Sequence, residues 1–334
     1  MPSLVTPEPL HPAEASFATD LPVRLGISRC LLGEPVRYDG GHKRNQFLVD
    51  VLGQHVEWFP VCPEVEAGFG TPREAMRLVE DVAEPRLLTV RSHHDYTGRM
   101  RRYAKTRVRE FQTLSLSGYV FKKDSPSCGI RRVRVYARDG RLLGTGKGLF
   151  AETFQRAFPL TPIEEEGRLR DQGLRENFIE RVFGYHRWQV LNARLTKGRL
   201  VAFHTVHKYL LLAHSQRHYR ALGRLVANAK HYPVRELART YGHLFMEALA
   251  VKTTIRKHVN VLQHLAGHFK NALSAKTRLE LHAALSDYHN GFVPLSVPVA
   301  LIGHYVRILD VPYVRDQVYL APHPKELTLH SVNG

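Results

Sequence analysis

Short apolar runs alternate with longer amphipathic stretches over residues 21–162. Three of the short runs predict strands: LPVRLGISRC (21–30), HVEWFPVC (55–62) and GYVFKK (118–123). A basic helix is predicted at TGRMRRYAKTRVREFQTL (97–114), and IRRVRVYARDGRLLG (130–144) predicts a hairpin with an Asp-Gly turn. Strands that alternate with helices indicate an α/β domain with a mainly parallel, Rossmann-like sheet.

The pattern changes beyond about residue 166. Apolar residues then recur at helical spacing with few glycines, as in VRELARTYGHLFMEALAVKTTIRKHVNVLQHLAGHF (234–269). We therefore expect an α/β domain over residues 21–165, followed by an all-α domain over residues 166–334. Residues 1–20 are polar and contain several prolines, and we expect a disordered lead-in there. They have no basic residue and no apolar core, so they do not predict a signal peptide.

Charge changes the picture of the helical half. The chain of 334 residues has a net charge of +17, and residues 181–334 carry 21 Lys and Arg against 7 Asp and Glu. A net positive charge of this size favours an anionic partner. Nucleic acid is the first candidate and an anionic membrane the second. The basic run at 98–109 has the interspersed tyrosine expected of an RNA-binding surface. No apolar run is long enough to predict a membrane-spanning helix.

The three cysteines, Cys30, Cys62 and Cys128, each follow one of the predicted strands. An odd number of cysteines without an export signal favours a reducing cytoplasm and free thiols. In parallel sheets ligands bind beyond the carboxyl ends of the strands, so the three thiols are expected at one edge. Thiolates gathered there would select a soft centre, either zinc or an iron–sulfur cluster, and three protein ligands leave one position open. The spacing of the three cysteines does not by itself decide for such a site. It also allows three unrelated thiols that bind nothing together.

The segments around the cysteines resemble a known family. SRCLLGEPVRYDG (28–40), PVCPEVEAGFGTPRE (60–74) and KKDSPSCG (122–129) are similar, in order, to the signature motifs of the 2-thiouracil desulfidase family. The helical half, through HKYLLLAHS (207–215) and DYHNGFVPLSVPVALIGHYV (287–306), resembles the accessory domain of the two-domain branch, which is associated with removal of sulfur from 4-thiouridine in tRNA. The resemblance implies that the three cysteines hold a [4Fe–4S] cluster. Arg29 departs from the family pattern, where a small residue is expected, and adds positive charge near the cluster.

The same resemblance gives roles to further residues. Replacement of C=S by C=O is a hydrolysis, and Glu64, two residues after Cys62, matches the catalytic glutamate and is the expected general base. Ser125 matches the functional serine and would position the pyrimidine or the water, with an ordinary turn serine as the alternative. Four basic residues near the motifs are candidates to bind phosphate or developing negative charge: Arg37, Arg73, Lys122 and Lys123. Asp39 would contact substrate or only shape its loop.

Other functions stay open at this point. A desulfidase of free thiouracil bases would not need the basic helical half, and a non-enzymatic RNA-binding sensor of iron or redox state would not need Glu64 and Ser125. A zinc-dependent deaminase would need an H-x-E and P-C-x-x-C pattern, which the sequence lacks. Histidine pairs at helical spacing, such as His204 and His207, are interpreted as core or RNA-facing residues rather than zinc ligands. The expected partner is thiolated tRNA, with no DNA and no membrane.

Overall fold

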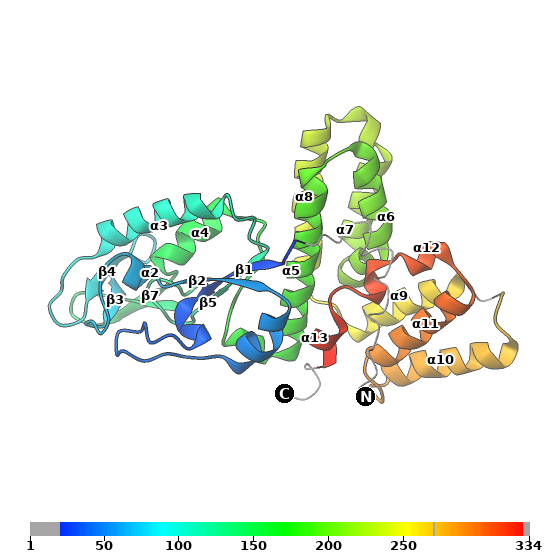
Figure 1. The fold of residues 1–334 in the computed structure, drawn as a ribbon, viewed down its shortest axis with the longest axis horizontal. Coiled ribbons are helices and arrows are strands. Elements are labelled where there is room, and N and C mark those ends of the chain that lie inside the picture. The colour runs from blue at the N-terminus through cyan, green and yellow to red at the C-terminus, as the bar shows by residue number, and fades with distance from the viewer. Residues whose placement is uncertain (1–20, 270, 330–334) are drawn as a thin grey trace, which may run out of the picture. The chain divides into compact units, whose positions relative to one another are not determined.

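The computed structural model describes residues 21–269 and 271–329, so the predicted lead-in over residues 1–20 lies outside the described residues. The described chain forms two compact units (Figure 1). One is an α/β unit made of residues 21–186 and 325–329, and the other is a helical unit made of residues 187–324. The division falls inside helix α5 (Gln172–Ala193). The expected α/β fold with a parallel sheet, followed by a largely helical region, is confirmed.

The first sheet carries the three predicted strands in its centre and at one edge. Its order is β2-β1-β5-β8, with every neighbouring pair parallel. The strands are β1 (Arg24–Ser28), β2 (Glu57–Val61), β5 (Gly118–Phe121) and β8 (Ile163–Glu165). Gly26 of β1 lies against the ring of Tyr119, where a Cβ atom would come within 2.1 Å of the ring. A glycine is therefore required for these two strands to pair closely.

A second sheet has the order β4-β3-β6-β7. The predicted hairpin is confirmed as the antiparallel pair β6 (Val133–Tyr136) and β7 (Leu142–Gly146), with Gly140 at φ 92° in the turn. The antiparallel pair β3 (Met76–Val79) and β4 (Arg86–Thr89) was not predicted from the sequence. Their connection, EDVAEP (80–85), lacks the Asp-Gly or Asn-Gly turn that marks a hairpin such as β6–β7.

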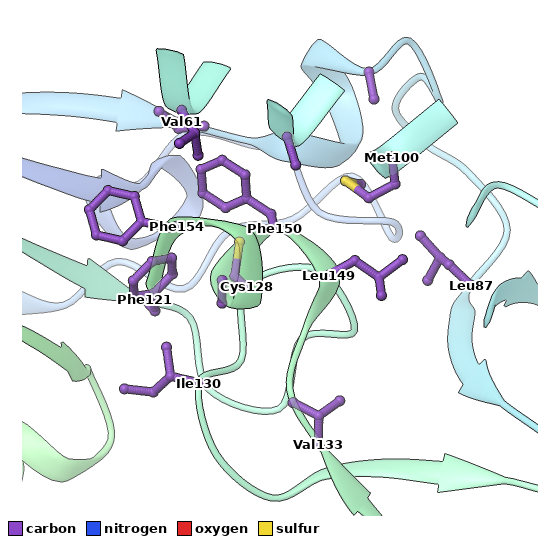
Figure 2. Packing of buried hydrophobic residues seen from close by; sticks show 14 of the residues in the cluster. Val61, Leu87, Met100, Phe121, Cys128, Ile130, Val133, Leu149, Phe150 and Phe154 are labelled. Carbon is purple, nitrogen blue, oxygen red and sulfur yellow. The ribbon is translucent and has the colours of Figure 1, made fainter. Parts of the chain in front are cut away.

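Helices α2 (Pro63–Glu66), α3 (Thr97–Phe111) and α4 (Leu149–Ala157) complete the α/β unit. The predicted basic helix is α3, which buries Met100, Ala104 and Val108 and leaves arginines exposed on its other side. Its buried residues belong to an aromatic-rich core that also contains Phe121, Phe150 and Cys128 (Figure 2). A second cluster lies on the other side of β1 and includes Ile27, Cys30 and Phe178. Each of these cysteines therefore belongs to a packed core as well as to a loop.

The helical unit consists of the end of α5 followed by helices with short connections. They are α6 (Lys197–His214), α7 (Gln216–Ala227), α8 (Val234–Ala250), α9 (Ile255–Gly267), α10 (Ala275–His289), α11 (Ser296–Ile308) and α12 (Pro312–Arg315). The side chains of Thr196, Ser215, Thr254 and Ser274 accept a backbone hydrogen bond at four of the helix N-termini. Such caps stabilise helix starts, which explains why α6, α7, α9 and α10 begin where they do.

The histidines of α6 lie in the core of this unit. His204 Nδ1 is 3.1 Å from the Tyr241 hydroxyl, and His207 is fully buried and stacked on Phe203. Burial lowers the pKa of His204 to about 4, so the buried ring is neutral. These contacts support the interpretation of the pair as core residues. Across the described ranges, no helix is both long enough and apolar enough to cross a membrane.

Candidate active site

A cavity of about 370 Å³ opens at the carboxyl ends of β1, β2 and β5. These strands are neighbours in the order β2-β1-β5, so the loops that follow them meet at one edge of the sheet. The cavity is lined by all three cysteines and by most of the predicted site residues. Its charged and sulfur-bearing lining residues are Arg29, Cys30, Arg37, Lys43, Cys62, Glu64, Arg73, Met76, Lys122, Lys123, Asp124 and Cys128.

Cys30 lies in a short 3-10 turn, Arg29–Leu32, directly after β1. Its carbonyl accepts hydrogen bonds from the backbone N–H groups of Gly33 (3.4 Å) and Lys43 (2.9 Å). Gly33 adopts a φ of 101°, a left-handed conformation that glycine takes without strain. The turn thus reverses the chain immediately after the cysteine and keeps its side chain at the edge of the sheet.

Cys62 is the N-cap residue of α2, directly after β2. Its N–H donates to Glu66 Oε1 at 3.0 Å, and its sulfur lies 3.7 Å from the carbonyl oxygen of Val36. Pro63 occupies the first helical position, where a missing N–H costs nothing. The CPE sequence therefore stops the strand and starts the helix at the cysteine.

Cys128 is held by the N-terminus of α4. The N–H of Leu149 donates to the carbonyl of Pro126, and those of Phe150 and Ala151 donate to the carbonyl of Ser127, all at 3.1 Å. The helix is preceded by Gly148, where a Cβ would come within 2.5 Å of the Ser127 carbonyl. The SPSCG turn is thus docked on a helix end through a glycine that the sequence analysis did not single out.

Burial raises the pKa of each thiol. The pKa of Cys30 rises to about 12, chiefly through desolvation and then through the neighbouring Cys62 thiol. Desolvation is also the main cause for Cys62 and Cys128, and the pKa of Cys128 is raised further by the charges of Glu64, Cys62 and Cys30. Burial therefore disfavours the thiolate form of each cysteine, and a cationic centre is what would bring all three to that form.

Glu64 lies in the first turn of α2 and faces the cavity. Its Oε2 is bound by Arg73, through Nε at 3.1 Å and a second short contact from Nη2. Its Oε1 accepts a hydrogen bond from Ser127 Oγ at 2.8 Å and a longer one from Ser125 Oγ at 3.5 Å. The Glu64 side chain is 14% exposed. It is therefore fixed in orientation beside the cysteines while keeping access to the cavity.

The two serines of the SPSCG turn have different surroundings. Ser125 lines the cavity, and its Oγ accepts the backbone N–H groups of Ser127 (3.2 Å) and Cys128 (3.0 Å). Ser127 is fully buried and donates the shorter bond to Glu64. Ser125 therefore stabilises the turn through its hydroxyl, and the same hydroxyl also faces the cavity. Ser127 has the closer contact with the carboxylate.

The four predicted basic residues all line the cavity, and each has an acidic neighbour. Arg73 uses its remaining donors on the carbonyls of Val36 (3.1 Å) and Gly70 (2.8 Å). Lys122 forms a short ion pair with Glu166. Lys123 is more exposed and lies 3.7 Å from Asp124. Arg37 pairs with Asp39 at 3.3 Å and Lys123 with Asp124 at 3.7 Å, without the further bonds that hold Arg73, so these two cations are better placed than Arg73 to contact a substrate.

Asp39 does not line the cavity. It accepts hydrogen bonds from Arg37 Nε (3.3 Å) and from the backbone N–H of Gly41 (3.0 Å). The bond from Gly41 lowers the pKa of Asp39. Of the two roles expected for Asp39, this geometry favours shaping the loop and orienting Arg37.

Both halves of the chain resemble known proteins. Residues 25–166 match the family model described as 2-thiouracil desulfurase, and residues 208–324 match a model described as a protein of unknown function (DUF1722). The chain is 30% identical over 156 residues to the uncharacterized protein YbgA of Escherichia coli K12, covering 46% of this chain and 92% of YbgA. The chain belongs to the YbgA family.

Two further relatives are more distant. The uncharacterized protein YbbK of Bacillus subtilis 168 is 26% identical over 136 residues, which is 39% of this chain and 89% of YbbK. A solved structure described as the [4Fe-4S]-dependent thiouracil desulfidase TudS is 29% identical, covers 47% of this chain and 99% of its own, and superimposes with a TM-score of 0.38. This YbgA-family chain thus combines an N-terminal 2-thiouracil desulfurase domain with a C-terminal DUF1722 domain.

The three thiols of the desulfurase domain are a donor set that fits an iron–sulfur cluster. Within the part of the chain that the structure describes, no group of three His, Cys, Asp or Glu residues lies close enough to hold one ion. The three thiols line a cavity of about 370 Å³. Iron–sulfur clusters are held by cysteine thiolates, and a larger group of that kind fits this space.

Several residues of the site could not be recognised from the sequence. Ser28, at the end of β1, accepts the N–H of Lys122 at 2.9 Å, and its hydrogen bond to the Cys128 thiol partly offsets the raised pKa of that thiol. Lys43 lines the cavity from a loop with no motif. Glu66 contacts the Cys62 backbone from within α2. The only sequence signal for Ser28 was its position two residues before Cys30.

Proposed function

We propose that the chain is an iron–sulfur-dependent desulfidase that converts 4-thiouridine in tRNA to uridine. The observation that carries the proposal is the gathering of Cys30, Cys62 and Cys128 at three neighbouring strand ends, with Glu64 fixed beside them. The match of residues 25–166 to the 2-thiouracil desulfurase model supports the class of reaction. The reaction consumes one water: the C=S bond is replaced by C=O, and the sulfur leaves as hydrogen sulfide.

The three cysteines would hold a [4Fe–4S] cluster, which supplies an iron with affinity for the thiocarbonyl sulfur of the substrate. Glu64 accepts a proton from the water that attacks the ring carbon, since it lines the cavity and is mostly buried, whereas the other lining carboxylate, Asp124, is 68% exposed. Ser127 and Arg73 hold the two oxygens of Glu64, so the carboxylate is oriented before substrate arrives. Ser125 Oγ and the cations of Arg37 and Lys123 face the same space and are placed to bind the pyrimidine and its phosphate.

The helical unit supports an RNA substrate through the distribution of its charge. Residues 187–235 contain 10 Lys and Arg and no Asp or Glu. Residues 280–324 contain 2 Lys and Arg and 4 Asp and Glu. Positive charge is therefore concentrated in α6, α7 and their connections, as expected of a surface that binds the phosphate backbone.

The exposed side of α7 carries a regular row of arginines. Arg217, Arg220 and Arg224 recur at helical spacing and are exposed. Among the described residues, none of these three side chains forms an ion pair with an acidic residue. Three unpaired guanidinium groups along one helix face suit a polyanion better than a free base.

The test is desulfuration by anaerobically purified protein that holds iron and sulfide. Thiolated tRNA should be converted to the uridine form with one sulfide released per base, at a higher kcat/KM than free 4-thiouracil or 2-thiouracil. A preference for the free bases would favour the second candidate, a thiouracil desulfidase, which the name of the matching family model suggests. Cluster-loaded protein that releases no sulfide from any of the three substrates would contradict both.

A further inference from the structure

One carboxylate links two of the cysteine loops. Glu66 Oε1 accepts hydrogen bonds from the backbone N–H of Cys62 (3.0 Å) and from Arg29 Nη2 (3.2 Å). Glu66 Oε2 accepts the Tyr103 hydroxyl at 2.5 Å, and Arg107 Nε lies 3.6 Å away. Glu66 thus joins the turn after β1, the start of α2 and the middle of α3.

Arg29 is the residue that brings the Cys30 loop into this arrangement. It directly precedes Cys30, lines the cavity and pairs with Glu34 (3.4 Å) as well as with Glu66. The departure of Arg29 from the expected small residue therefore has a structural partner in this chain. Neither the arginine nor Glu66 has an equivalent connection to Cys128, whose loop is fixed by α4 instead.

Tyr103 anchors the arrangement in the protein interior. It packs against the core cluster of the α/β unit, and its ring centroid lies 6.2 Å from that of Phe150. The neighbouring residues Met100 and Ala104 of α3 are fully buried, so the helix cannot shift easily. Glu66 itself is not among the cavity-lining residues. It therefore acts on the site only through the loops that it holds.

We infer that Glu66 is a positioning residue that fixes the Cys30 and Cys62 loops relative to each other and so sets how firmly the cluster is held. The inference rests on the proposed function, because it requires that these cysteines hold a cluster. Removal of an outer-shell partner of a metal site typically weakens metal affinity by about 10- to 100-fold. Glu66 meets the condition for such an effect, since its loss would leave the Cys62 N–H, Arg29 and Tyr103 without their shared acceptor.

The experiment measures how fast the cluster is lost from holoprotein. An iron chelator is added anaerobically, and the decay of the visible absorbance is followed for the wild type, Glu66→Gln, Glu66→Ala and Tyr103→Phe. We expect decay to be about 10-fold faster for Glu66→Gln and up to about 100-fold faster for Glu66→Ala. Tyr103→Phe removes a single hydrogen bond and should give a smaller acceleration in the same direction. It also keeps the test decisive if the Glu66 variants do not fold.

Glu80→Gln is the matched control. Glu80 also holds two arginines, Arg86 and Arg138, but it follows β3 of the second sheet and does not line the cavity. Its replacement should leave the decay rate unchanged even if it lowers the unfolding temperature of the apoprotein. If the cluster decays at the wild-type rate in all folded Glu66 and Tyr103 variants, this inference is overturned and the proposed function is not. A wild type that never holds iron and sulfide would overturn the proposed function, and this inference with it.

Discussion

Ser127 Oγ donates a 2.8 Å hydrogen bond to Glu64 Oε1, and Ser127 also accepts two N–H groups of α4 through its carbonyl. One residue thus joins the proposed base, the turn that carries Cys128 and the helix that fixes this turn. Glu64→Gln should leave the cluster spectrum intact and lower turnover of thiolated tRNA by about 10²- to 10⁴-fold. Ser127→Ala should give a smaller loss in kcat with little change in KM. Near-normal turnover by Glu64→Gln would reduce Glu64 to a structural residue of the loop.

Each of the three cysteines should be required for the cluster. Cys30→Ser, Cys62→Ser and Cys128→Ser should each lose most bound iron and sulfide, because the chain has no further cysteine to replace them. The measurement is iron and acid-labile sulfide per protein after anaerobic reconstitution. Full iron content in all three variants would show that these residues are not ligands.

Gly148 should be intolerant of any side chain. A Cβ there would lie 2.5 Å from the Ser127 carbonyl, so Gly148→Ala must displace either α4 or the Cys128 turn. We expect a loss of about 1–3 kcal/mol in the free energy of unfolding, as for other overpacked sites, together with reduced iron content. Gly98→Ala is the control, since its nearest neighbour would be at an ordinary 3.6 Å. Equal stability of the two variants would contradict the docking of the turn on α4.

The helical unit should lose stability in mild acid. Burial, and then the charge of Lys208, lowers the pKa of His204 to about 4, whereas the unfolded value is about 6.5. The unfolded state therefore binds the proton more readily, and stability falls as the pH drops from about 6.5 to about 4. Thermal unfolding across this range should show the fall, and His204→Gln should reduce it. His243→Gln, at an exposed position of α8, should behave like the wild type.

Binding of tRNA should depend on salt and on the α7 arginines. Combined replacement of Arg217, Arg220 and Arg224 by Gln should weaken binding and reduce the slope of log affinity against log salt by about two to three. The matched control replaces three exposed basic residues of α10 and α11, Lys276, Arg278 and Arg307, at the same cost in net charge. An equal effect in both triple variants would assign the binding to net charge rather than to α7.

Much of the arrangement around the cysteines could be predicted from the sequence. The three strands before Cys30, Cys62 and Cys128 were recognisable as short apolar runs, and parallel pairing then required their ends to meet. Glu64 and Ser125 lie two and three residues from Cys62 and Cys128, so they had to be near the cavity. These predictions succeeded because each depends on the few residues that follow a strand.

The connections between loops could not be predicted. Arg29, Glu66 and Tyr103 belong to three elements, and only the packing of α3 brings the tyrosine to the carboxylate. The same holds for Gly148, whose importance depends on a turn 20 residues earlier in the chain. Asp39 shows the opposite case, since a loop close to a cysteine in sequence turns its carboxylate toward Arg37 and away from the lining of the cavity.

The order β2-β1-β5 has a mechanical consequence for the α/β unit. The cysteines are separated by 32 and 66 residues in the sequence, yet they follow three strands that lie side by side. A cluster bound to all three would act as a covalent cross-link that closes two long loops of the unfolded chain. Because binding free energy at such a site is also folding free energy, cluster assembly would lock the edge of the sheet against fraying. The apoprotein should accordingly open first at this edge, where the three loops would no longer share a common anchor.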